Sequence, residues 1–163
     1  MTRAIIFDLD GTLIDTSAIS RLRDARDWRG CVKSLDSTQL FPGVAELLTA
    51  LEARELKWAV VTNVVSFYAH AALSHFGLRA PTLVAYHDVK RCKPHPEGCL
   101  KAAELLGFAP AEVLGVGDLE TDREAYVGAG MAAVCAGWNP AAESGGPWDG
   151  LLRSPADLMK CLK

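Results

Sequence analysis

Two aspartates one residue apart, Asp8 and Asp10, follow a short apolar run and stand directly before Gly11 and Thr12. The apolar run, residues 4–7, is typical of a buried strand in a parallel sheet. Ligands of open α/β sheets bind at the carboxyl ends of the strands, which is where this pair lies. Two carboxylates beside an apolar sheet repel each other and lose hydration, and a divalent cation between them removes that cost. The pair therefore predicts a site for a divalent cation.

Three more groups of polar residues follow later apolar runs. Thr62 and Asn63 end the second run, where a hydroxyl and a backbone N–H can hold a phosphate oxygen. Lys93 lies in a proline-rich loop just before a predicted helix, whose N-terminus favours anions. Asp118 and Asp122 flank a turn after the fourth run. Each of these residues alone has an ordinary explanation. Thr62 could be a common strand residue, Lys93 a solvated surface lysine, and Asp118 and Asp122 acids that cap a helix. Their shared place at strand ends indicates one site instead.

Together these four pieces resemble the four motifs of the haloacid dehalogenase-like superfamily in its phosphatase form. The matched strings are Asp-Leu-Asp-Gly-Thr from residue 8, Thr-Asn from residue 62, Lys-Pro from residue 93 and Gly-Asp-Leu-Glu-Thr-Asp from residue 117. The resemblance runs from Arg3 to about Ala136, and its first and fourth motifs are the specific ones. We therefore expect the chemistry of that superfamily from this chain.

The resemblance implies catalytic roles for four residues. Asp8 matches the nucleophile, and Asp10 matches the general acid and base. Thr62 and Lys93 match the groups that hold the phosphate oxygens while charge redistributes. A carboxylate that attacks phosphorus forms an acyl phosphate, which water can cleave in a second step. The expected phosphate- and substrate-binding residues are Thr62, Asn63, Lys93 and Gly11.

The resemblance also implies a Mg²⁺ cofactor. Asp118 matches the direct metal ligand, and Asp122 matches the acid that supports it. The cation would bridge Asp8, Asp118, the backbone carbonyl of Asp10 and the phosphate, because Mg²⁺ prefers oxygen ligands. The expected metal-binding residues are Asp8, Asp10, Asp118 and Asp122.

Apolar runs alternate with helical patterns along the chain, which predicts βαβ units and a parallel sheet. The predicted strands are Ala4–Phe7, Trp58–Thr62, Thr82–Tyr86, Val113–Val116 and Ala132–Ala136. The predicted helices are Val44–Arg54, Ser66–Phe76, Pro96–Leu106, Thr121–Ala129 and Ser154–Leu162. We expect a three-layer, doubly wound α/β fold with a mainly parallel five-stranded sheet. The resemblance implies a Rossmann-like core with strand order 5-4-1-2-3. The glycine- and proline-rich stretch 138–150 is expected to be a loop.

The segment 16–40 interrupts this alternation, because it mixes charges of both signs and holds few large apolar side chains. Its basic residues are Arg21, Arg23, Arg26, Arg29 and Lys33. We expect one or two short helices outside the sheet, forming a minimal cap that covers the site only partially. Most of these charges are expected to be solvated, with steering of an anionic substrate as the alternative. The chain, 1–163, is expected to form a single domain that carries this short insert.

Composition excludes several classes of protein. The net charge of −3 provides no basic field and disfavours a nucleic-acid partner. Neither a membrane-spanning run nor a signal peptide is recognisable in the sequence, so we expect a cytoplasmic protein without a membrane partner. The five cysteines are scattered and lack Cys-x-x-Cys spacing, which indicates free thiols rather than a zinc site or disulfides.

The function expected is Mg²⁺-dependent hydrolysis of a phosphate monoester through a phosphoaspartate on Asp8. The expected substrate is a phosphorylated small molecule or an exposed phosphoester on a larger molecule. A phosphotransferase or phosphomutase is an alternative, although a short insert excludes little water from the intermediate. A second alternative is a non-catalytic phosphate-binding domain, but the complete set of motif residues argues against it. Receiver domains fit less well, because their phosphorylated Asp follows the third strand, where this chain has the poorer match His87-Asp88. Dehalogenases fit less well, because they need no second acid at the position of Asp10, which would protonate an alcohol leaving group. A homo-oligomer and the roles of His95 and Trp138 stay open.

Overall fold

The computed structural model describes residues 1–162 and contains a six-stranded sheet with all neighbouring strands parallel. The strand order is β5-β4-β1-β6-β7-β8. The strands are β1 (Ala4–Phe7), β4 (Lys57–Val61), β5 (Leu83–Val84), β6 (Val113–Gly117), β7 (Ala132–Ala136) and β8 (Gly150–Leu152). The α/β class and the relative order of the five predicted strands are confirmed.

The predicted number of strands is wrong by one. Gly150 begins β8, which pairs with β7 at the edge of the sheet. The strand has only three residues and directly follows a glycine- and proline-rich stretch, so alternation could not reveal it. The predicted loop 138–150 therefore ends one residue earlier and leads into a sixth strand.

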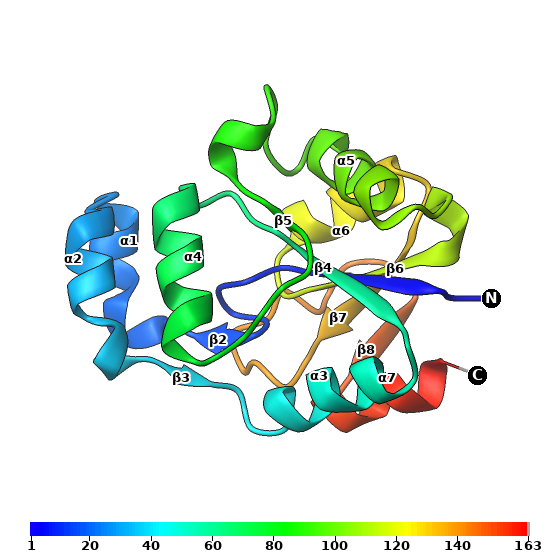
Figure 1. The fold of residues 1–163 in the computed structure, drawn as a ribbon, viewed down its shortest axis with the longest axis horizontal. Helices are drawn as coiled ribbons and strands as arrows, with labels where there is room; N and C mark the ends of the chain where they lie inside the picture. Colours follow the sequence, from blue (N-terminus) through cyan, green and yellow to red (C-terminus); the bar gives the residue numbers. More distant parts are fainter. Residues whose placement is uncertain (163) are drawn as a thin grey trace.

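Helices cover both faces of the sheet and make three layers (Figure 1). One layer holds α3 (Val44–Ala53), α4 (Ser66–His75) and α7 (Pro155–Cys161). The opposite layer holds α5 (Glu97–Leu106) and α6 (Glu120–Gly128). Each helix agrees with its predicted range to within one residue at either end. Among residues 1–162, no helix combines the length and the apolar character that crossing a membrane requires.

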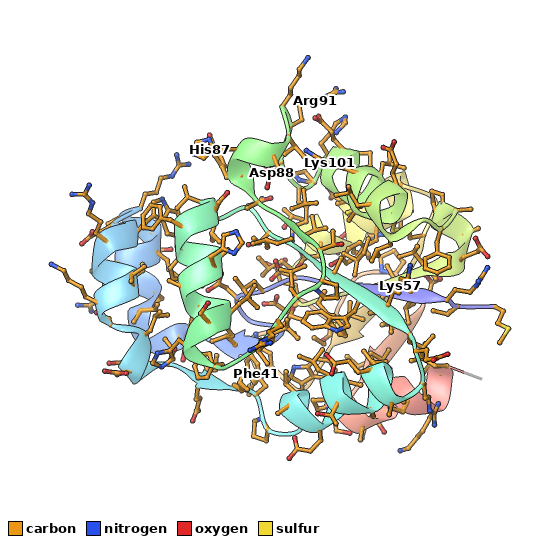
Figure 2. The ribbon with its side chains drawn as sticks, in the orientation of Figure 1. Phe41, Lys57, His87, Asp88, Arg91 and Lys101 are labelled. Atoms are coloured by element: carbon orange, nitrogen blue, oxygen red, sulfur yellow. The ribbon has the colours of Figure 1, made fainter. Side chains whose placement is uncertain are left out.

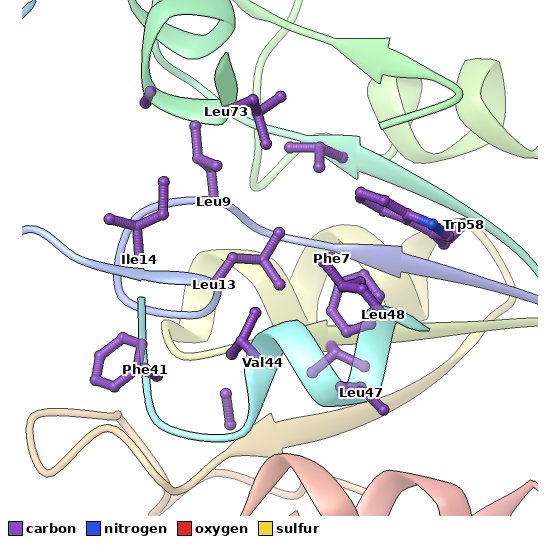
Figure 3. Close-up of a cluster of buried hydrophobic side chains, with 14 of the residues drawn as sticks. Phe7, Leu9, Leu13, Ile14, Phe41, Val44, Leu47, Leu48, Trp58 and Leu73 are labelled. Atoms are coloured by element: carbon purple, nitrogen blue, oxygen red, sulfur yellow. The ribbon is translucent and has the colours of Figure 1, made fainter. Parts of the chain in front are cut away.

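Strand β1 lies at the centre and is buried along its whole length. Its alternate residues face opposite layers, because side chains alternate across a strand. Ile5 and Phe7 join the core beneath α3, α4 and α7, and Ile6 joins the core beneath α5 and α6. Figure 3 shows Phe7 close to Trp58 and Leu48, and the rings of Phe7 and Trp58 meet edge to face at 6.2 Å. Fully burying such a side chain stabilises the fold by about 1.5–3 kcal/mol, so the strand that directly precedes Asp8 is held firmly.

A glycine sets the distance between β6 and α6. Tyr126 of α6 lies directly over Gly115, where a Cβ would overlap the aromatic ring. The Tyr126 hydroxyl donates a hydrogen bond to the Val116 carbonyl at 3.0 Å. Close packing of this helix on this strand brings its first turn to the strand's carboxyl end.

The segment 16–40 lies outside the main sheet, as the sequence predicts. It contains η1 (Ser17–Ile19), α1 (Ser20–Asp24), α2 (Trp28–Lys33) and η2 (Leu35–Ser37). The short strands β2 (Ile14–Asp15) and β3 (Gln39–Leu40) pair antiparallel and close its base. Figure 1 shows α1 and α2 standing beside α4 at one end of the molecule. The insert is therefore anchored against a helix of the core.

Two turns of 3₁₀-helix, η3 (Tyr86–Asp88) and η4 (Pro110–Glu112), complete the chain's regular elements within residues 1–162. The η3 turn begins the long connection to α5. Figure 2 shows Asp88 near Lys101 of α5, and the Lys101 Nζ donates to the Asp88 carbonyl at 2.6 Å. The Asp88 carboxylate also accepts from the Ala85 N–H at 2.8 Å. These bonds hold the connection that carries Lys93.

Candidate active site

Three neighbouring strands deliver the motif residues to one edge of the sheet. Asp8 directly follows β1, Thr62 directly follows β4, and Asp118 directly follows β6. Asp122 lies in the first turn of α6, and Lys93 lies in the connection before α5. Residues that are up to 114 positions apart in the sequence therefore meet at the carboxyl ends of β4, β1 and β6.

Three of the aspartates form a buried carboxylate cluster. Asp8, Asp118 and Asp122 each offer an oxygen, and these oxygens lie within 4.8 Å of one another. Burial, followed by repulsion from Asp122, raises the pKa of Asp8 well above its usual value. The same two causes raise the pKa of Asp118 to about 6. The cluster is thus electrostatically costly when its acids are ionised.

Lys93 partly balances this charge. Its Nζ donates to Asp8 Oδ1 at 2.7 Å, to Asp122 Oδ1 at 2.6 Å and to the Val61 carbonyl at 2.8 Å. Burial lowers the pKa of this amine, but Asp122 and Asp8 outweigh that effect and raise it, so Lys93 is charged. The Asn63 amide accepts from the Lys93 N–H and donates to its carbonyl. Asn63 thereby sets the position of Lys93.

Asp10 lies outside the carboxylate cluster and has partners of its own. Its Oδ1 accepts a hydrogen bond from the Tyr68 hydroxyl at 2.7 Å and lies 3.5 Å from Arg23 Nε. Burial and the charge of Asp10 raise the pKa of Tyr68, so the phenol stays protonated and donates. The other oxygen, Oδ2, is buried and has no hydrogen-bond partner. Asp10 is therefore fixed by one oxygen, which leaves the other available to a ligand.

The donor set fits a divalent cation. Four buried aspartates meet two basic side chains, Lys93 and Arg23, which leaves an excess of two negative charges. Hard oxygen ligands in this number are what Mg²⁺ selects. A doubly charged ion beside Asp8 and Asp118 would relieve the repulsion that raises the pKa of both acids.

The loop after β1 is built around Asp118. Gly11 has a φ of +86°, and a Cβ at this position would collide with the Asp118 carboxylate. Thr12 Oγ1 donates to Asp118 Oδ1 at 3.0 Å, and Asn139 Nδ2 donates to Asp118 Oδ2 at 3.2 Å. The Gly11 N–H already donates to the Ile14 carbonyl at 2.8 Å. Gly11 therefore has a conformational role here, and its phosphate contact stays a prediction.

The structure brings the sequence-predicted residues together. A small cleft of about 70 Å³ is lined by Asp8, Asp10, Thr62, Asn63, Lys93 and Asp122, among others. Asp118 contributes from the carboxylate cluster. Asp122 also accepts from the Leu119 N–H at 3.0 Å, so it caps α6 and pairs with Lys93 at once. Both explanations of this acid, as a helix cap and as a site residue, therefore hold.

Sequence reasoning missed several residues that contact this site. Tyr68 reaches Asp10 from α4 and carries no sequence signal. Arg23 reaches Asp10 from α1, and the sequence marks it only as one of the five basic residues of the insert. Asn139 reaches Asp118 from the stretch that we predicted to be a loop, and Trp138 Nε1 donates to the Thr12 carbonyl at 2.9 Å. Thr12 carries a sequence signal because it belongs to the first motif, whereas the sequence leaves the role of Trp138 open.

Replacing Tyr68 by Phe is expected to lower kcat about tenfold, the effect of losing one hydrogen bond to a charged group. The superfamily resemblance implies that Asp10 is a general acid, which only poor leaving groups need, so the loss should be greater for alkyl phosphates than for esters with a good leaving group. Steady-state kinetics with both ester types test this. A Tyr68→Phe protein with equal losses for both would show that the tyrosine only supports the fold.

Comparison with known proteins gives a consistent result. The sequence model of haloacid dehalogenase-like hydrolases matches residues 20–130. The N-acetylmuramic acid 6-phosphate phosphatase of Pseudomonas aeruginosa is 31% identical over 215 residues of alignment, which cover 98% of this chain and 94% of the relative. The phosphatase of the same name from Pseudomonas putida is 35% identical over 133 residues, covering 77% of this chain. This chain spans 59% of that relative's length.

Solved structures share the fold at low sequence identity. The crystal structure of CbbY from Rhodobacter sphaeroides in complex with phosphate matches with a TM-score of 0.79 at 22% identity, over 97% of this chain and 96% of that one. A hydrolase of subfamily IA from Geobacter sulfurreducens also matches with a TM-score of 0.79 at 22% identity, over 99% and 100% of the two chains.

Proposed function

Because this chain belongs to the haloacid dehalogenase-like hydrolase family, we propose that it hydrolyses phosphate monoesters through a phosphoaspartate on Asp8. The observation that carries the proposal is the buried group of Asp8, Asp118, Asp122 and Lys93, with Asp10 beside it. The curated relatives support the reaction class, because they are named as phosphatases.

Asp8 and Asp10 divide the chemistry. A carboxylate oxygen of Asp8 bonds to phosphorus while the bond from phosphorus to the leaving oxygen breaks. Asp10 gives that oxygen its proton from Oδ2, the atom without a partner in this structure. Asp10 then takes a proton from water, which attacks phosphorus and releases phosphate from Asp8. Lys93 and Thr62 hold the phosphate oxygens during both steps.

Mg²⁺ is the proposed cofactor, held by Asp8 and Asp118, with Asp122 in support and Asp10 contributing its backbone carbonyl. When bound, the ion supplies positive charge to the phosphate oxygens. The fit of the site to this ion rests on the uncompensated carboxylates of the cluster.

Mg²⁺ is expected to raise the melting temperature of this protein, because it offsets repulsion that is present only in the folded state. A concentration of 100 times the dissociation constant would add about 2.7 kcal/mol to the free energy of unfolding. Thermal melts with Mg²⁺ and with EDTA measure the shift, and Asp118→Asn should reduce it strongly. Asp36→Asn, at a side chain that is 95% exposed, is the matched control and should keep the full shift. An unchanged shift in Asp118→Asn would contradict the metal role of Asp118.

Phosphate release from a panel of phosphorylated metabolites, nucleotides and phosphopeptides, measured with Mg²⁺, tests the reaction. Hydrolysis of at least one small ester is expected. Transfer of phosphate to an added alcohol in preference to water would favour a phosphotransferase. Failure to turn over any ester, together with tight phosphate binding, would favour a non-catalytic domain.

The remaining features of the proposal concern substrate and setting. A phosphorylated small molecule is the proposed substrate, as for the relatives, whose names include phosphoglycolate phosphatase from Escherichia coli. We also propose that residues 1–163 form one domain whose insert is a minimal cap. The alignment with the P. aeruginosa relative is longer than this chain, so the relative has residues at positions where this chain has none. Five free cysteines support a reducing location such as the cytoplasm.

A further inference from the structure

A second cleft, of about 430 Å³, adjoins the small catalytic cleft. Arg23, Asn63 and Val64 line both, so the two are continuous at these residues. The insert forms one wall of the larger cleft with Arg26 and Trp28, and the core forms the other. A group attached to a phosphate at Asp8 would therefore extend into this larger cleft.

We propose that the larger cleft binds the leaving group of a small phosphate ester, and that this group carries a second negative charge recognised by Arg26. The proposal rests on the proposed function and specifies its substrate class. A ring or carbon skeleton would lie between Trp28 and Tyr86, and the second anion, a carboxylate or a phosphate, would lie at Arg26.

The two arginines of the cleft differ in whether their guanidinium groups already have partners in the protein. Arg23 is already paired, because its Nη1 donates to Thr16 Oγ1 at 3.0 Å and its guanidinium forms an ion pair with Asp10, with Nε 3.5 Å from Oδ1 but not hydrogen-bonded to it. Arg26 forms no ion pair with any residue from 1 to 162. Arg26 is an exposed residue, and the fork of N–H donors of its guanidinium matches a carboxylate or phosphate. Arg26 is thus the free cation of this cleft.

The backbone at Arg26 is unusual. Its φ is 54°, in the left-handed region, which costs an ordinary residue about 1–2 kcal/mol. The turn between α1 and α2 is closed by the Arg26 N–H, which donates to the Arg23 carbonyl at 2.9 Å. Glycine would adopt this conformation more easily, but only a long basic side chain supplies charge to the cleft.

The walls of the cleft suit an organic skeleton. Trp28 is half-buried, and its ring lies 5.5 Å from that of Tyr68, so it is held in place. Tyr86 is 43% exposed across from the insert. Aromatic faces bind rings and carbon chains, and a volume of this size is typical of small-molecule sites. The single acid among the lining residues, Asp24, is exposed and stands against two arginines, Arg23 and Arg26, so the lining carries a net positive charge.

The test compares two esters that differ in one charge. Para-(carboxymethyl)phenyl phosphate and para-ethylphenyl phosphate have similar size and leaving groups. The native protein is expected to bind the carboxylated ester about tenfold more tightly, the effect of one charged hydrogen bond. Arg26→Gln should remove this preference by raising KM for the carboxylated ester only, with kcat nearly unchanged. Arg29→Gln removes the same charge from α2 at a residue that lines neither cleft, and should keep the preference.

A second variant tests the aromatic wall. Tyr86→Ala should raise KM for both aromatic esters equally and leave methyl phosphate unaffected. Calorimetric titration of the Asp8→Asn protein with the two aromatic esters gives their affinities without turnover. Equal affinity for both esters, or equal behaviour of Arg26→Gln and Arg29→Gln, would overturn the inference. Continued hydrolysis of para-ethylphenyl phosphate would in that case leave the proposed phosphatase function standing.

Discussion

Replacing Asp8 by Asn is expected to lower kcat by more than about 10⁴-fold, as removal of a covalent nucleophile does in other enzymes. An amide oxygen is a poor nucleophile toward phosphorus, so the first step fails. The side chain keeps its shape, and its oxygen still accepts from Lys93, which donates to Asp8 Oδ1 at 2.7 Å in this structure. The fold should therefore survive, and phosphate release measured beside the thermal melt separates the two effects.

Asp36→Asn is the matched control for Asp8→Asn, because it makes the same chemical change at an exposed aspartate. Its turnover should equal that of the native protein. Acid quenching of the native enzyme with a labelled ester should trap a phosphoprotein that Asp8→Asn lacks. Turnover by Asp8→Asn at the native rate would disprove nucleophilic catalysis by this residue.

Replacing Asp10 by Asn is expected to lower kcat by about 10²–10⁴-fold for alkyl phosphates, the usual contribution of a general acid. Esters with a good leaving group, such as para-nitrophenyl phosphate, should lose less, because their oxygen leaves without a proton. The structure gives the physical reason, since Asp10 is held by Tyr68 through Oδ1 while Oδ2 has no partner. The ratio of kcat for the two ester types, in native and variant proteins, is the measurement.

The kinetics of Asp10→Asn need a control variant that changes the charge near this position without removing the acid. Arg23→Gln removes the cation that lies 3.5 Å from the same carboxylate but leaves the acid in place. Its two ester types should be affected to a similar extent, because no proton donor is lost. Identical, complete loss for both esters in Asp10→Asn would contradict the separate roles of Asp8 and Asp10.

The sequence by itself identified the candidate site residues at the ends of the strands. Apolar runs followed at once by Asp8, Thr62 and Asp118 are local patterns, and the carboxyl ends of parallel strands meet at one edge of a sheet. The α/β class followed from the alternation of apolar runs and helical patterns, and the order of the five predicted strands followed from the family resemblance. The sixth strand did not, because β8 is three residues long and one of them is glycine.

The tertiary structure alone decided how the site is completed. Tyr68 meets Asp10 across 58 positions of sequence, and Asn139 meets Asp118 from a stretch with no periodic pattern. Such contacts depend on how α4 and the loop before β8 pack against the core. The spacing of residues along the sequence does not show this packing. The same holds for the insert, whose five basic residues look alike in the sequence. Packing of α2 against α4 places Arg26 in the larger cleft, and Arg29 on the same insert lines neither cleft.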